Sequence, residues 1–233
     1  MGAPETLIEL DFDLNLLTGK VQPQHDERFK LIPPQFCGGA EHYLLQSVCV
    51  AVINMIEFAQ KDGITLTVVS ATRHFERQKA IWEHKWSGAV AVEGVYLNES
   101  TLSGEEKVQR ILRYSAMPGT SRHHWGTDVD LNSVEPEYFE TEQGLTEYEW
   151  LKDNAPLFGF EQPYTAKSQE RPSGYEEEKW HWSFVPYSKM MLEAYNKRVN
   201  YEHIDGFNGA KYATKLHIIE DYVFGVAASC RMF

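Results

Sequence analysis

The sequence is poor in cysteine. Its 233 residues include only Cys37, Cys49 and Cys230, and no two of these have the spacing of a metal-binding pair. A zinc site of the cysteine-rich structural kind is therefore not expected. Cys49 lies in an apolar run of helical spacing and is interpreted as a small buried hydrophobe. Cys37 and Cys230 lie near opposite chain ends, and chain ends often lie close together in folded domains. The sequence therefore leaves open whether these two residues form a disulfide.

The sequence also lacks long apolar runs and any excess of basic residues. No stretch reaches the length of a membrane span, and no charged-then-apolar leader of signal-peptide type is visible at the start of the chain. The formal net charge is −12 at pH 7. Nucleic acids and anionic membrane surfaces are therefore not expected as partners, whereas a divalent cation fits this charge.

No internal repeat, low-complexity block or interdomain linker divides the chain, and strands and helices do not alternate regularly. We therefore predict a single α+β domain with a central, mainly antiparallel sheet and helices packed on it. Residues 1–40 are expected to form an irregular N-terminal arm, residues 41–205 the main domain, and residues 206–233 a C-terminal extension packed on that domain. Periodicity predicts helices at 41–62, 75–86, 105–114, 146–158 and 187–200, and strands at 64–71, 129–131 and 180–185.

Two short segments carry most of the chemical groups. The first runs from Ser121 to Asp130 with the sequence Ser-Arg-His-His-Trp-Gly-Thr-Asp-Val-Asp, and the second is Glu178-Lys-Trp-His-Trp. They contain imidazoles and carboxylates but no cysteine. This inventory is typical of a catalytic zinc site, in which three protein ligands leave a fourth position open for water.

The spacing suggests which side chains meet. His123 and Asp130 are seven residues apart and would face opposite sides of a straight strand, but a turn at Gly126 lets both reach one point. His181 is the natural third ligand. Two alternatives stay open at this stage, because His124 competes with its neighbour and Asp128 shares a strand face with Asp130. Asp128 could therefore bind the metal itself or orient one of its ligands.

Two further side chains have candidate catalytic roles. Glu178 lies three residues before His181, which suits a base close to the metal better than a fourth ligand. Arg73 follows the expected strand at 64–71, and its planar cation could stabilise an oxyanion. The simpler interpretations are a solvated acidic run at 176–178 and a surface arginine.

Three motifs together resemble a known family. The segment ending at Asp130 resembles the Ser-x-His-x-x-Gly-x-Ala-x-Asp signature of VanY-type D-alanyl-D-alanine carboxypeptidases. The segment from Glu178 is similar to their Glu-x-x-His-Trp signature, and Arg73 to Gln78 resembles their Arg-Ser-x-x-x-Gln segment. The motifs occur in the family's order. Asp128 and His74 depart from the pattern, standing where the family usually has Ala and Ser.

The resemblance implies the fold shared by these peptidases, LytM-type peptidases and the hedgehog signalling domain. It implies that Zn²⁺ is the cofactor and that Glu178 is the base, while Arg73 stabilises the substrate carbonyl. It makes Ser121 a candidate for holding the terminal carboxylate of the substrate, and Gln78 a second candidate for substrate binding. The implied zinc ligands are His123, Asp130 and His181.

The implied function is zinc-dependent removal of the terminal D-Ala from peptidoglycan stem peptides or their precursors. Such a substrate places the enzyme in the periplasm, outside the cell or in the cell envelope. A cell-wall endopeptidase or an L,D-carboxypeptidase would use the same chemistry, and loops at 88–103 and 161–175 are expected to decide between them. The alternative of another class is a zinc-binding module without catalysis, which would not need Glu178.

Overall fold

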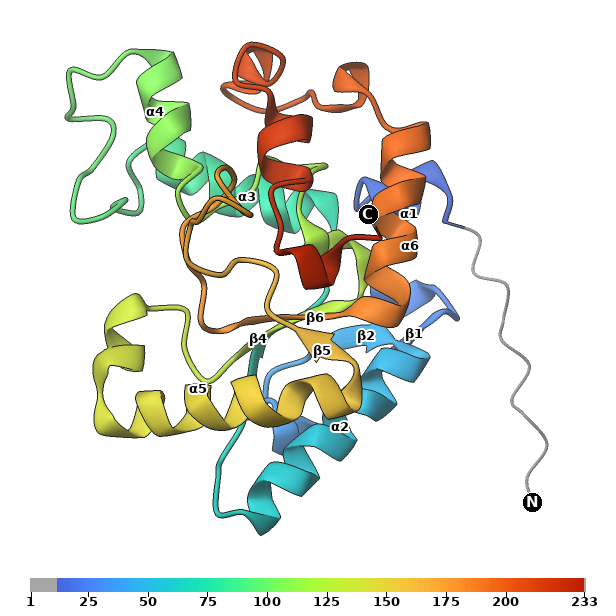
Figure 1. The fold of residues 1–233 in the computed structure, drawn as a ribbon. Helices are drawn as coiled ribbons and strands as arrows, with labels where there is room; N and C mark the ends of the chain where they lie inside the picture. Colours follow the sequence, from blue (N-terminus) through green and yellow to red (C-terminus); the bar gives the residue numbers. More distant parts are fainter. Residues whose placement is uncertain (1–11, 233) are drawn as a thin grey trace.

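The computed structural model describes residues 12–232. Its centre is a four-stranded antiparallel sheet, and a separate two-stranded sheet lies beside it (Figure 1). In this view α2 (Gln46–Lys61) and α5 (Glu142–Asn154) lie on one side of the larger sheet, and α3 (Phe75–Trp86) and α4 (Gly104–Ile111) lie on the other. The larger sheet has the order β3 (Val68–Ser70), β4 (Asp128–Leu131), β6 (His181–Phe184), β5 (Phe160–Glu161), and the smaller one pairs β1 (Phe29–Leu31) with β2 (Tyr43–Leu45).

The predicted helices are present, with some shifted ends. Helix α3 has the predicted bounds, and the side chain of His74 caps it by accepting a hydrogen bond from the Arg77 amide. Helix α5 begins earlier than predicted because the Thr141 hydroxyl caps the Gly144 amide. The helices are α1 (Leu14–Leu17), α2 (Gln46–Lys61), α3 (Phe75–Trp86), α4 (Gly104–Ile111), α5 (Glu142–Asn154) and α6 (Val185–Arg198).

The start of α2 corrects the predicted helix at 41–62. Residues 43–45 form β2 instead, because β1 from the N-terminal region pairs with them in an antiparallel ladder. From Gln46 onward the helix buries six side chains at helical spacing, and Gly63, with a φ of +77°, follows its end. The buried residues are Val48, Cys49, Val52, Met55, Ile56 and Ala59.

Both flanking segments contact the core. The N-terminal region contains α1 and β1 and is thus not wholly irregular, and the Trp125 indole donates a hydrogen bond to the Leu17 carbonyl. Near the C-terminus, Ile218, Val226 and Cys230 are fully buried. Residues 1–11 of the expected arm lie outside the described residues.

The three cysteines do not pair. Cys37, Cys49 and Cys230 are all buried free thiols, so the disulfide considered between the chain ends is absent. Burial raises the pKa of Cys37 and of Cys230 to about 11, which keeps both as neutral thiols. Across residues 12–232, no helix combines the length and the apolar character that crossing a membrane requires.

Strand register and one turn bring the two sequence motifs together. Asp130 lies opposite His181 on the neighbouring strand, and Asp128 lies opposite Ser183. Side chains of directly opposed residues lie on the same face of a sheet, so these four groups share one face. Before β4, the chain reverses at Gly126, which has the left-handed φ of +72°. The predicted turn at Gly126 is therefore present.

We expect Gly126→Ala to lower the free energy of unfolding more than Gly63→Ala does. Both glycines have left-handed φ angles, which cost an alanine about 1–2 kcal/mol. A Cβ at Gly126 would also lie 2.5 Å from the Phe29 ring, whereas one at Gly63 would meet nothing within 4 Å. Overpacking should therefore lower the free energy of unfolding of Gly126→Ala by about 1–3 kcal/mol more than that of Gly63→Ala, as measured by urea unfolding. Equal losses in the two variants would show that the Phe29 contact is easily relieved.

Candidate metal centre and active site

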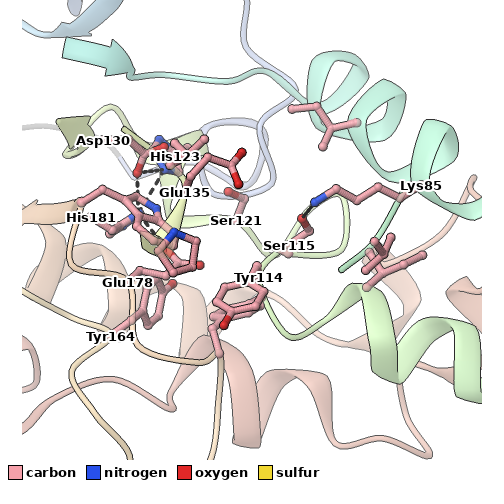
Figure 2. A pocket seen from close by; sticks show the side chains of 18 of the residues that line it. Lys85, Tyr114, Ser115, Ser121, His123, Asp130, Glu135, Tyr164, Glu178 and His181 are labelled. Carbon is pink, nitrogen blue, oxygen red and sulfur yellow. Dashed lines mark hydrogen bonds and ion pairs between the residues drawn. The ribbon is translucent and has the colours of Figure 1, made fainter. Parts of the chain in front are cut away.

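Three buried side chains converge on one point at the end of the sheet (Figure 2). His123 Nε2 lies 3.2 Å from both His181 Nδ1 and Asp130 Oδ1, and the last two atoms are 3.0 Å apart. His123 comes from the short turn before Gly126, while the other two residues come from adjacent strands. The structure thus assembles the three side chains that the sequence motifs single out as ligands.

The donor set fits a zinc ion. Ligands about 2.0–2.2 Å from a tetrahedral zinc lie about 3.3–3.6 Å apart, so these atoms need to separate only slightly. His123 Nδ1 donates a hydrogen bond to the Ala71 carbonyl at 2.8 Å, which leaves its Nε2 lone pair for a metal. His181 Nε2 can donate to Asp128 Oδ1 at 3.0 Å, which directs its Nδ1 toward the same point.

The charges of the site also favour a cation. Burial by itself raises the pKa of Asp130, but His123 and His181 lower it well below its usual range. Burial disfavours the charged form of His181, yet Asp128 and Asp130 raise its pKa to about 9. The two carboxylates thus attract a positive charge to this point. A metal ion would replace the His181 proton, so we expect its binding to release a proton.

Asp128 supports His181 from the side opposite the three donors. Arg122 Nε donates to Asp128 Oδ1 at 2.9 Å, and Arg122 Nη2 donates to the Ser183 hydroxyl at 2.6 Å. Arg122 and Asp128 are completely buried as an ion pair. Arg122 was missed in the sequence, although a carboxylate expected within a strand is a signal that a basic partner is needed. Asp128 therefore contacts the ring nitrogen of His181 that points away from the triad, and it lies outside the triad itself.

We expect Asp128→Asn to weaken zinc binding by about 10- to 100-fold, because it removes the charge that orients His181. It should also lower the free energy of unfolding by about 3–5 kcal/mol, because it leaves Arg122 buried without its ion pair. Zinc titration and urea unfolding measure the two effects. The double variant Asp128→Leu, Arg122→Met should regain much of the stability but not the zinc affinity. Wild-type zinc affinity in Asp128→Asn would contradict this role.

His124 is occupied elsewhere and does not compete for the metal. Its Nδ1 donates to the Arg73 carbonyl at 2.6 Å, and its Nε2 accepts a hydrogen bond from the Gly119 amide at 3.0 Å. Burial lowers the pKa of His124 to about 3, so this ring is neutral. It joins the segment that carries Arg73 to the first motif, so the structure places His123, and not His124, beside Asp130 and His181.

Glu178 and Arg73 both line the cavity beside the three donors. Glu178 Oε2 lies 3.6 Å from His181 Nδ1, and burial raises the pKa of this carboxyl to about 8. The side chain of Tyr164 packs against the His181 ring, with ring centroids 4.9 Å apart. Arg73 Nε is buried and has no hydrogen-bond partner within the described chain, so it can donate to a bound group.

The cavity has a volume of about 660 Å³, and the metal donors lie at one end of it (Figure 2). Ser121 is almost fully buried but lines the cavity, which is the position that a substrate contact requires. Gln78, by contrast, is buried and does not line the cavity, because its Nε2 donates to the Ala116 carbonyl at 2.8 Å. This position corrects the expectation of a direct substrate contact, since Gln78 supports the wall instead.

Fold and site together define the class of small α+β metallopeptidases, with a His–Asp–His donor set beside a buried glutamate. The sequence matches the VanY family, D-alanyl-D-alanine carboxypeptidase, over residues 41–187. This match covers more than half of the chain, and the chain therefore belongs to the VanY family.

Two curated relatives agree with this assignment. The chain is 31% identical to YodJ of Bacillus subtilis over 147 residues, which cover 62% of this chain and 47% of YodJ. It is 29% identical to the D-alanyl-D-alanine carboxypeptidase of Enterococcus faecalis over 132 residues, covering 57% and 44% of the two chains. The chain thus spans about half the length of the curated relatives it matches.

Solved structures share the fold. VanYB in complex with D-alanine-D-alanine has a TM-score of 0.53 and 22% identity, covering 75% of this chain and 87% of that one. A mutant of the vancomycin-resistance D,D-pentapeptidase VanY in complex with Zn(II) has a TM-score of 0.51 and 23% identity, covering 76% and 94%. The LD-carboxypeptidase LdcB also scores 0.51 with 23% identity, covering 75% and 79%. At these identities the likeness establishes the predicted DD-peptidase fold.

Proposed function

We propose that this chain is a zinc-dependent D,D-carboxypeptidase that removes the terminal D-Ala from peptidoglycan stem peptides. The observation that carries the proposal is the position of Glu178, whose carboxyl group lies 3.6 Å from the His181 donor atom and lines the cavity. A site that only binds metal has no use for a buried base at this place. Family membership and the zinc-bound structure of a VanY enzyme support the same chemistry.

Each side chain has a defined part in the proposed reaction. His123, Asp130 and His181 would hold the zinc ion, which would supply a Lewis acid for the peptide carbonyl and a lower pKa, about 7, for its bound water. Glu178 takes the proton of the attacking water and passes it to the leaving amine. Arg73 donates to the carbonyl oxygen as negative charge develops there.

Ser121 is proposed to hold the terminal carboxylate of the peptide, because its buried hydroxyl lines the same cavity. A fixed terminal carboxylate selects removal of a single residue and disfavours cleavage within a longer chain. The substrate implies that the enzyme works in the cell envelope or outside the cell, on stem peptides or their precursors.

The test is hydrolysis of synthetic stem peptides by the zinc-loaded protein, followed by mass spectrometry. We expect a pentapeptide ending in D-Ala-D-Ala to lose one D-Ala. A tetrapeptide ending in a single D-Ala should remain intact. Cleavage of the tetrapeptide alone would assign an L,D-carboxypeptidase instead, and cleavage within cross-linked dimers would assign an endopeptidase. No hydrolysis with bound zinc would favour the non-catalytic module.

A further inference from the structure

A lysine and a serine meet at the end of the cavity that lies away from the metal donors (Figure 2). Lys85 belongs to the last turn of α3, and Ser115 lies in the loop after α4. Lys85 Nζ donates a hydrogen bond to Ser115 Oγ at 2.5 Å, and both residues line the cavity. In Figure 2, Ser121 lies between this pair and the metal donors.

Lys85 lacks the partner that a buried cation normally has. Among residues 12–232 its amino group makes no ion pair, and the Ser115 hydroxyl is its hydrogen-bond partner. Burial and the charge of Arg73 lower the pKa of Lys85, while the charges of Glu178 and Glu135 act in the opposite direction. A partly buried ammonium with only a neutral partner is costly, and an anion entering the cavity would relieve this cost.

The pair is also held in place before any ligand arrives. Ser115 is 7% exposed, and the next residue, Ala116, is fixed through its carbonyl by the Gln78 side chain. Gln78 lies on α3 and faces the same loop as Lys85, so one helix positions both members of the pair. A preformed cation and hydroxyl bind a carboxylate with little loss of side-chain entropy.

We propose that Lys85 and Ser115 form a carboxylate-binding subsite for the peptide substrate, at the opposite end of the cavity from the metal donors. This proposal rests on the proposed peptidase function and adds a substrate requirement to it. A stem peptide contains such a group on its internal acidic residues, in addition to the terminal carboxylate that is assigned to Ser121. The shared chemistry is a carboxylate that accepts hydrogen bonds from the ammonium and the hydroxyl.

The test compares three peptides that all end in D-Ala-D-Ala. The first has every carboxylate free, the second has a C-terminal amide, and the third has its internal carboxylates amidated. Wild type, Lys85→Met, Lys85→Arg and Ser115→Ala are assayed with zinc bound. Lys197→Met removes a lysine charge from an exposed position on α6 that does not line the cavity, and it serves as the matched control. Circular dichroism establishes that each variant is folded.

For the first peptide we expect Lys85→Met to raise KM by about 10- to 100-fold with kcat changed by less than about threefold. Lys85→Arg should recover part of this loss, and Lys197→Met should match wild type. With the internally amidated peptide, wild type and Lys85→Met should have equal KM values, whereas the peptide with the C-terminal amide should keep the difference between the two proteins. Three results would overturn the subsite. They are an unchanged KM in Lys85→Met, an equal rise in its KM for all three peptides, or a fall in kcat without a change in KM.

Failure of the proposed function is distinguishable from failure of the subsite. If zinc-loaded wild type cleaves none of the peptides, the peptidase proposal is wrong, and calorimetric titration of the same peptides then tests the subsite alone. The subsite predicts that the first peptide binds wild type about 10- to 100-fold more tightly than Lys85→Met. Equal binding to the two proteins would reject it.

Discussion

Replacing Glu178 with glutamine is expected to slow hydrolysis of a D-Ala-D-Ala peptide by about 10²- to 10⁴-fold while leaving zinc bound. Glutamine keeps the shape of the side chain but cannot accept the proton of the attacking water. The Glu178 carboxylate lies 3.6 Å from His181 Nδ1 and is not one of the three donor groups, so zinc should stay. Steady-state kinetics and metal analysis of the same sample measure both quantities.

Glu177→Gln is the matched control, because Glu177 is the adjacent acidic residue and does not line the cavity. Its activity should equal that of wild type. A Glu178→Gln enzyme with a near-normal rate would show that another group removes the proton. Loss of zinc from this variant would show instead that Glu178 is a ligand.

Asp130→Ala is expected to abolish zinc binding and to reduce the rate by at least about 10³-fold. This substitution removes the only carboxylate of the donor triad and the charge that His123 and His181 share, although His181 keeps its contact with Asp128. For wild type, zinc at 100 times its Kd should raise the free energy of unfolding by about 2.7 kcal/mol. The variant should gain almost nothing, which thermal unfolding with and without zinc would reveal.

A chelator provides the reversible version of this experiment. Wild type stripped of metal should lose activity and regain it when zinc is added, whereas Asp130→Ala should not respond. Asp205→Ala removes an exposed carboxylate that does not line the cavity and should behave as wild type. Zinc affinity in Asp130→Ala equal to that of wild type would rule out the proposed donor set.

Sequence patterns with local causes were predicted well. The bounds of α3 follow from its periodicity and the residues at its ends, and the strands around Asp130 and His181 follow from β-branched and aromatic residues near the motifs. The turn at Gly126 was predicted because two ligands at odd spacing need a reversal between them. The family assignment and the fold class, which rest on these motifs, are confirmed.

Contacts between distant segments were predicted poorly. Residues 43–45 were predicted to begin a helix but form β2, because they pair with β1. The sequence of β1 has no strand pattern, so this pairing was not predicted. Gln78 matches a family motif but supports the cavity wall from behind. Lys85 had no motif to mark it, and its place in the cavity arises from the packing of α3 against the loop after α4.

By itself, the sequence determined the family and the donor types of the candidate site, because these types, their spacing and the neighbouring glutamate are local properties of two short segments. Only the tertiary structure decided between neighbours such as His123 and His124, or Asp128 and Asp130. In a turn or a strand, the side chains of adjacent residues point in different directions. The strand register then determines which side chains from different segments come into contact. The Arg122–Asp128 ion pair and the Lys85–Ser115 pair likewise depend on burial, which no single segment encodes.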